Sequence, residues 1–213
     1  MAFPPRIALA TRNPGKVREI LAICHDWPVA WVTAIDDPDA VGSRDIERWP
    51  NVAETGQTYL ANARLKAHAV AEAQGLPAVA DDSGIEVDAL GGEPGVRSAR
   101  FAGEEATDEA NLQLLIDRIR DVPGSDRTAR YRCVAVLAWP DGRDVWAEGS
   151  CAGRLILEPR GSGGFGYDPV FVPVDLARSG DERTMAELLD EEKNAISHRG
   201  KAFRALGAKL EAS

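Results

Sequence analysis

Apolar residues near the start of the chain are spaced first as a strand and then as a helix. Residues 6–10 form a short apolar run that is typical of a buried strand. Apolar residues at the i, i+3, i+4 and i+7 positions predict a helix after it, and these are Val17, Ile20, Leu21 and Cys24. The chain therefore begins with a predicted strand, turn and helix.

The next stretch predicts a second helix and two short strands. Thr58 is a suitable N-cap for a helix that runs to about Ala73, before a glycine and a proline that end it. Residues 77–80 are apolar, and residues 85–89 alternate between apolar and polar. We expect two strands here, joined through residues 81–84.

The second half of the chain adds a helix, a hairpin and a final helix. Thr107 is predicted to cap a helix whose apolar stripe reaches Ile119. Residues 130–139 and 144–151 are typical of two strands joined by a turn, and Ser197 is a cap for the last helix. Strands interspersed with helices predict an α/β fold with a mixed central sheet and flanking helices.

Composition and charge narrow the class of protein. The 213 residues suit one domain or a tight two-lobed one. A total of 34 acidic against 25 basic side chains gives a net charge of −9, which disfavours DNA or RNA as a partner. No apolar run has the length of a membrane span, and the three cysteines lack the spacing of a disulfide framework or zinc site. We therefore expect a cytoplasmic protein.

The turn after the first strand is a candidate phosphate site. It is formed by Thr11, Arg12, Asn13, Pro14, Gly15 and Lys16. Backbone N–H groups at a helix N-terminus attract phosphate, and Lys16 adds a positive charge. The spacing is not that of a Walker A loop. A plain strand-to-helix turn with Lys16 in solvent would suit the same residues.

Carboxylates at Asp81, Asp82 and Glu54 are candidate metal ligands. Two adjacent carboxylates at the end of a buried strand need a compensating partner, because burying an unpaired charge is costly. A Mg²⁺ ion would be such a partner, and a carboxylate beside it can take a proton from water. The alternatives are an Asx-type turn for the aspartate pair and a solvated or helix-dipole role for Glu54.

A glycine-rich segment over residues 161–169 is a candidate site for a nucleobase. An exposed Phe165 or Tyr167 could stack on a base, although both rings could instead lie in the core. Cations just before and within the first turn of a helix oppose its dipole, so those near the last helix suggest an anion or a keto oxygen nearby, unless they are simply solvated. These cations are Lys193, His198 and Arg199.

Five segments, in this order, resemble the inosine triphosphate pyrophosphatase family, also called the non-canonical purine NTP pyrophosphatases. The segments are residues 11–16, 54–56, 80–84, 163–169 and 197–200. The resemblance covers nearly the whole chain. It implies a single domain over residues 1–213, with two lobes around a substrate cleft, that assembles as a homodimer.

The resemblance also implies a role for each matching residue. Asp82 is implied as the catalytic base, and Glu54 and Asp82 as the ligands of Mg²⁺. The residues implied to bind the nucleotide are Thr11, Arg12, Asn13, Pro14, Gly15, Lys16, Ser83, Phe165, Gly166, Tyr167, Asp168, Lys193, His198 and Arg199. Four polar residues near these segments have no implied role, namely Asn62, Lys66, Arg97 and Arg100.

The implied activity is Mg²⁺-dependent hydrolysis of ITP, dITP and XTP to the monophosphate and pyrophosphate, with a small nucleotide as partner and no nucleic-acid polymer or membrane. Donors on His198 and Arg199 would select a 6-keto purine, because the 6-amino group of adenine would leave them unpaired. Two alternatives stay open. One is a pyrophosphatase for other modified or ordinary nucleotides, and the other is a non-catalytic nucleotide-binding module.

Overall fold

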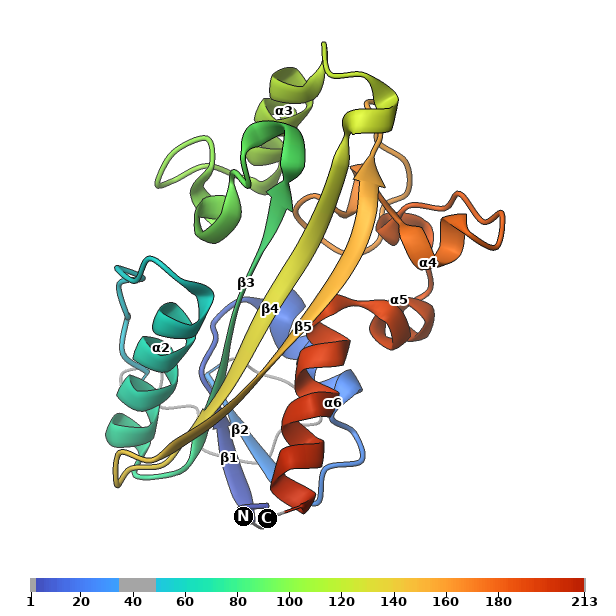
Figure 1. Cartoon of the computed structure of the whole chain (residues 1–213). Coiled ribbons are helices and arrows are strands. Elements are labelled where there is room, and N and C mark those ends of the chain that lie inside the picture. The colour runs from blue at the N-terminus through green and yellow to red at the C-terminus, as the bar shows by residue number, and fades with distance from the viewer. Residues whose placement is uncertain (1–2, 35–48, 213) are drawn as a thin grey trace. The chain divides into compact units, whose positions relative to one another are not determined.

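The computed structural model describes residues 3–34 and 49–212, and the six strands found there form one mixed sheet (Figure 1). The strand order is β2-β1-β3-β4-β5-β6. Strand β1 pairs in parallel with β2 and β3, whereas β5 and β6 are antiparallel, which confirms the predicted α/β fold. The strands are β1 (Arg6–Leu9), β2 (Ala30–Thr33), β3 (Ala78–Val87), β4 (Thr128–Ala138), β5 (Asp144–Leu155) and β6 (Phe171–Pro173).

The helices begin and end at residues that satisfy their terminal backbone groups. Asn13 Oδ1 accepts from the Lys16 N–H, and the hydroxyls of Thr58 and Thr107 cap two further helices as predicted. Gly75 ends one of these in the left-handed conformation, with φ of 64°. The α-helices are α1 (Pro14–Ile23), α2 (Tyr59–Gln74), α3 (Asp108–Ile119), α4 (Val174–Ala177), α5 (Asp190–Ile196) and α6 (His198–Glu211). Short 3₁₀ helices span Asp88–Leu90, Gly95–Arg100, Gly124–Asp126, Asp168–Val170 and Met185–Glu187. None of the helices in this part of the chain is long and apolar enough to cross a bilayer.

The region of the aspartate pair differs from its prediction. Strand β3 runs without interruption from Ala78 to Val87, so residues 81–84 lie within a strand and form no turn. Aspartate, serine and glycine favour turns in isolation. Here Asp81 and Asp82 both have side-chain partners on other elements, so an extended backbone can carry them into the interior. The interpretation as an Asx-type turn is therefore wrong.

The chain divides into two compact units, each with its own core. Unit 1 comprises Met1–Asp82, Cys133–Gly149 and Arg199–Ser213, and unit 2 comprises Ser83–Arg132 and Ser150–His198. The predicted substrate cleft stays a prediction.

In unit 1, apolar side chains of α1 and α6 pack with those of β1, among them Val17, Ile20, Phe203, Leu206, Ile7 and Leu9. In unit 2, the stripe of α3 packs with β3 and β6 through Leu115, Ile119, Ile85, Val87 and Phe171. Each core buries one face of its helices, which leaves the helix termini to carry polar groups.

We expect Thr107→Ala to lower the free energy of unfolding by about 1 kcal/mol, because the Thr107 hydroxyl accepts from the Ala110 N–H at 3.2 Å. Urea unfolding would measure the loss. Thr107→Ser keeps the hydroxyl and should be close to wild type. Equal losses in the two variants would show that the cap itself does not stabilise α3.

Candidate functional site

The turn between β1 and α1 is held by its own side chains. The Asn13 N–H donates to Thr11 Oγ1 at 3.2 Å, and Asn13 caps the helix through the Lys16 N–H at 3.1 Å. Arg12 donates to the backbone carbonyl of Trp49. Pro14 occupies the first turn of the helix, where its missing N–H costs nothing. The predicted phosphate segment is therefore a well-formed helix N-terminus.

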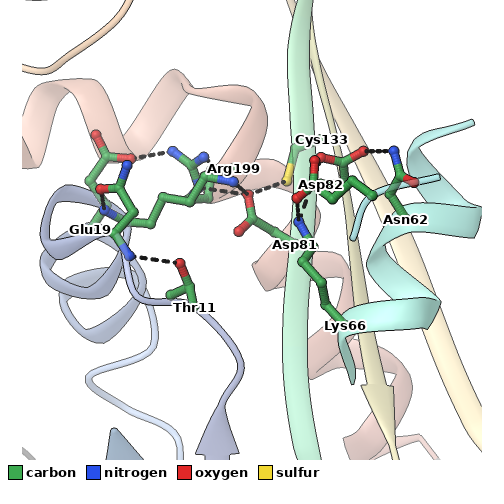
Figure 2. A network of polar contacts seen from close by, with 11 residues as sticks. Thr11, Glu19, Asn62, Lys66, Asp81, Asp82, Cys133 and Arg199 are labelled. Atoms are coloured by element: carbon green, nitrogen blue, oxygen red, sulfur yellow. Dashed lines mark hydrogen bonds and ion pairs between the residues drawn. The ribbon is translucent and has the colours of Figure 1, made fainter. Parts of the chain in front are cut away.

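Lys16 does not point into solvent, which excludes the plain-turn interpretation for this residue. Its ammonium lies 3.3 Å from Asp81 Oδ2, and only 18% of its side chain is exposed. The same Asp81 oxygen accepts from Arg199 Nε at 3.2 Å and from Arg199 Nη2 at 3.0 Å (Figure 2). Arg199 also bonds Glu19 through Nη1. Two cations and two carboxylates thus form one buried network.

This network keeps Asp81 and Arg199 charged. Burial would raise the pKa of Asp81, but the positive charges of Lys16, Arg199 and Lys66 hold that pKa well below its usual range. Burial would also lower the pKa of Arg199, and the charges of Asp81 and Glu19 raise it instead. The Arg199 guanidinium therefore stays positively charged at the start of α6.

A second polar cluster surrounds Asp82. Asn62 Nδ2 donates to Asp82 Oδ2 at 3.1 Å, and the side-chain oxygen Oδ1 of Asn62 accepts from the Gly56 N–H at 2.8 Å. One turn further along α2, the Lys66 ammonium lies 2.7 Å from Glu54 Oε1. The same ammonium lies 3.6 Å from Asp82 Oδ1 (Figure 2). A Cβ on Gly56 would come within 2.6 Å of the Asn62 oxygen, so glycine is required there.

The electrostatics of Asp82 differ from those of its neighbour. Burial raises the pKa of Asp82, and the charge of Glu54 adds to this, against the opposing charges of Lys66 and Lys16. Burial would lower the pKa of Lys66, but the carboxylates of Asp82, Asp81 and Glu54 together raise it. Lys66 is thus a charged group held between two carboxylates.

The donor set fits a Mg²⁺ ion that takes its other ligands from a substrate. Glu54 and Asp82 approach the same ammonium, so their hard oxygens converge on one point. Within residues 3–34 and 49–212, no group of three or more histidine, cysteine or acidic side chains is arranged to hold a metal by itself. Mg²⁺ is commonly held by one or two carboxylates and substrate phosphates, and this pair matches that pattern.

In unit 2, Asp168 anchors the glycine-rich segment. Its Oδ2 accepts from Lys193 Nζ at 2.7 Å and from the Phe165 N–H at 3.0 Å, and its Oδ1 accepts from the Tyr131 hydroxyl at 3.1 Å. Asp168 and Lys193 are both buried. Asp168 therefore holds the backbone of the segment in place at Phe165.

Only one of the two predicted stacking rings is available to a base. Phe165 is half-buried, and the Lys193 ammonium lies 5.1 Å from its ring centroid. Tyr167 is buried, and its hydroxyl donates to the Ser98 carbonyl at 2.7 Å, so this ring belongs to the core. The neighbouring Gly166 N–H donates to Asp108 at 3.1 Å. Ser83, the remaining substrate candidate, is half-buried in β3.

The three predicted cations divide between the two units. Lys193 bonds Asp168 in unit 2, where His198 stacks on Tyr131 with ring centroids 4.6 Å apart. Arg199 belongs to unit 1 and directs its donors to Asp81 and Glu19, so it is not an exposed donor at the start of α6. The expectation of solvated cations is wrong for all three, because each is buried.

Four residues of these clusters have no role predicted from the sequence, namely Asn62, Lys66, Glu19 and Tyr131. Asn62 and Lys66 could have been found from their i, i+4 spacing on the helix that follows Glu54. Glu19 and Tyr131 lie on predicted elements but carry no signal of their own, since their partners are far away in sequence. Arg97 and Arg100 lie 4.0 and 3.7 Å from the carboxylate of exposed Glu104. Pairs of this kind contribute little.

Comparisons with known proteins agree in sequence and in structure. The model of the Ham1 family matches residues 7–209. A dITP/XTP pyrophosphatase of Streptomyces coelicolor is 52% identical over 201 residues, which cover 94% of each chain. A HAM1 protein structure from Coxiella burnetii matches with a TM-score of 0.81 and 36% identity over 100% of both chains. A dITP/XTP pyrophosphatase structure from Mycobacterium abscessus matches with a TM-score of 0.69 and 41% identity, over 96% of this chain and 98% of that one.

We expect Asp81→Asn to lower the free energy of unfolding by about 3–5 kcal/mol, because it removes the negative charge that faces buried Arg199 and partly buried Lys16. Urea unfolding checks this. Asp141→Asn is the control, since Asp141 pairs with Arg143 in an exposed contact, and it should leave the midpoint unchanged. Similar midpoints for the two variants would contradict a stabilising role of the Asp81 charge.

Proposed function

Because this chain belongs to the Ham1 family, we propose that it hydrolyses ITP, dITP and XTP to the nucleoside monophosphate and pyrophosphate. The observation that carries this proposal is the identity of 52% to a dITP/XTP pyrophosphatase over nearly the full length of both chains. The two polar clusters of unit 1 and the aromatic segment of unit 2 supply groups for the triphosphate, for the hydrolysis and for the base.

We assign the triphosphate to the start of α1 and to the two lysines near it. Helix N-termini attract phosphate through their N–H groups and dipole, and α1 begins at a capped turn. Lys16 and Lys66 add two partly buried ammonium groups, each already facing carboxylates. When a nucleotide binds, its phosphate oxygens would take over part of the contacts that these carboxylates make with the two ammonium groups.

Glu54 and Asp82 are the residues that would hold Mg²⁺. When bound, the ion neutralises phosphate charge and polarises the phosphorus that is attacked. Lys66 lies between these carboxylates, so it keeps their repulsion low before a substrate arrives.

Asp82 is the group that we propose as general base. Asn62 orients one of its carboxylate oxygens at 3.1 Å, and the strand backbone of β3 positions its Cα. The water oxygen forms a bond to the α-phosphorus, the proton passes to Asp82, and the bond from the α-phosphorus to the bridging oxygen breaks. Pyrophosphate leaves, and the monophosphate remains.

We assign the base to unit 2. Phe165 offers a half-buried ring for stacking, and Lys193 lies over that ring. Lys193 and His198 are candidate donors for a 6-keto oxygen, and an adenine amino group would leave such donors unpaired, which can cost orders of magnitude in kcat/KM. Arg199 bonds Asp81 and Glu19, so we assign it to the charged network that includes Lys16. We assign base selection to Lys193 and His198 of unit 2.

We also propose that the enzyme acts in the cytoplasm as a homodimer. The support is the family relationship, together with a strongly acidic chain that suits a small-molecule substrate over a nucleic-acid polymer. Sedimentation of the purified protein would measure the size of the assembly.

Product analysis gives the most direct test of this function. ITP turnover with Mg²⁺ should yield IMP and pyrophosphate in equal amounts, because attack is at the α-phosphorus. Chromatography of the nucleotides and an assay for pyrophosphate would measure both. Release of IDP and orthophosphate would overturn the mechanism, and equal rates with ITP and ATP would overturn the substrate preference.

Asp82→Asn keeps the size and the Asn62 contact but removes the charge and the proton acceptor. We expect kcat for ITP to fall by about 10²–10⁴-fold, the usual contribution of a general base. Asp88→Asn is a suitable control, because Asp88 is an exposed carboxylate that directly follows the last residue of β3. Near-normal turnover of Asp82→Asn with excess Mg²⁺ would assign Asp82 a structural role.

A further inference from the structure

Tyr131 links the groups of unit 2 that we assign to the base, although its own side chain lies in the core. We infer that Tyr131 is a positioning residue for base recognition, acting through Asp168 and His198 to hold Phe165 and Lys193 in a single arrangement. This inference rests on the proposed function, since it concerns how the same base would be selected.

The first link is the hydrogen bond from the Tyr131 hydroxyl to Asp168 Oδ1, at 3.1 Å in the interior. The other oxygen of Asp168 accepts from Lys193 Nζ and from the Phe165 N–H, at 2.7 and 3.0 Å. A carboxylate that rotates about its Cβ–Cγ bond would exchange these two roles. The Tyr131 hydroxyl opposes that rotation because it engages the carboxylate oxygen that Lys193 does not.

The second link is the ring of Tyr131. It stacks on the His198 imidazole with centroids 4.6 Å apart and planes within 9°, and it contacts Phe171 at 4.7 Å. The orientation of the imidazole is therefore set by a side chain of β4, in the middle of the sheet order. Tyr131 thus positions two groups. One is the candidate donor His198, and the other is Asp168, the carboxylate that holds the second candidate donor, Lys193.

The backbone of the glycine-rich segment approaches Asp168 closely at Gly164. A Cβ at Gly164 would lie 2.1 Å from Asp168 Oδ2 and 2.8 Å from Lys193 Nζ, so the backbone rests directly on this pair. A displaced Asp168 would move the backbone at residue 164 and, through its N–H bond, Phe165. The position of the Phe165 ring therefore depends on the Tyr131 hydroxyl, which acts through Asp168.

The test uses Tyr131→Phe, which removes the hydroxyl and keeps the ring on His198. Thr128→Val is the matched control, because it removes a hydroxyl-to-carboxylate bond of the same strand, from Thr128 to exposed Asp88 at 2.7 Å. We expect Tyr131→Phe to raise both the KM and the Kd for ITP by about tenfold, the effect of losing one hydrogen bond to a charged group. The kcat at saturating ITP should change by less than about twofold, since the hydroxyl serves binding and not the chemical step.

Two further measurements separate positioning from a general loss of stability. The ratio of kcat/KM for ITP over ATP should fall in Tyr131→Phe and stay at the wild-type value in Thr128→Val. Combining Tyr131→Phe with Asp168→Asn should cost no more than Asp168→Asn alone, because both changes act on one group. Additive losses, or an unchanged Kd for ITP in Tyr131→Phe, would overturn the inference.

The Kd is measured by calorimetry with ITP in the absence of Mg²⁺, so it does not depend on turnover. A wild-type chain that binds ITP but releases no pyrophosphate once Mg²⁺ is added would overturn the proposed function and leave the effect of Tyr131→Phe on Kd as the test of positioning. A wild-type chain that binds ITP neither with nor without Mg²⁺ would overturn both.

Discussion

The carboxylate of Asp81 is the charge on which unit 1 depends. It lies buried in the middle of β3 and is stabilised there by Lys16 from α1 and Arg199 from α6, while Glu19 balances the second contact of the guanidinium. Burying one member alone would be costly, whereas the four together are neutral. Helix α1, to which we assign the phosphates, is therefore tied to the strand that carries Asp82 by electrostatics as well as by apolar packing.

The two aspartates illustrate how neighbours in sequence can do different work. Strand alternation points their side chains to opposite faces of β3, so Asp81 meets the cations of α1 and α6, and Asp82 meets Asn62 and Lys66 of α2. The pKa of the first is lowered and that of the second is raised. A turn over residues 81–84 could not have separated the two environments in this way.

Local signals in the sequence predicted most of the elements, because caps and apolar spacing act within a few residues. Thr58 and Thr107 illustrate this, since each was predicted to cap the helix that follows it and does so. The strand through Asp81 and Asp82 was missed because its partners lie up to 118 residues away, beyond any local pattern. The same distance hides the contact of Glu19 with Arg199 and the hydroxyl of Tyr131, which a single sequence cannot pair with Asp168. The roles of the substrate and metal residues came from the resemblance and stay predictions.

The division of the chain into two units has a consequence for dissecting the gene. The backbone passes from one unit to the other between Asp82 and Ser83, Arg132 and Cys133, Gly149 and Ser150, and His198 and Arg199. Unit 1 therefore consists of three separate stretches and unit 2 of two, so no single truncation or continuous fragment encodes either one. Splitting the protein for complementation or fusion would require breaks in the hairpin over residues 139–143 or in exposed loops, because any cut at a crossing severs a strand or the first turn of α6.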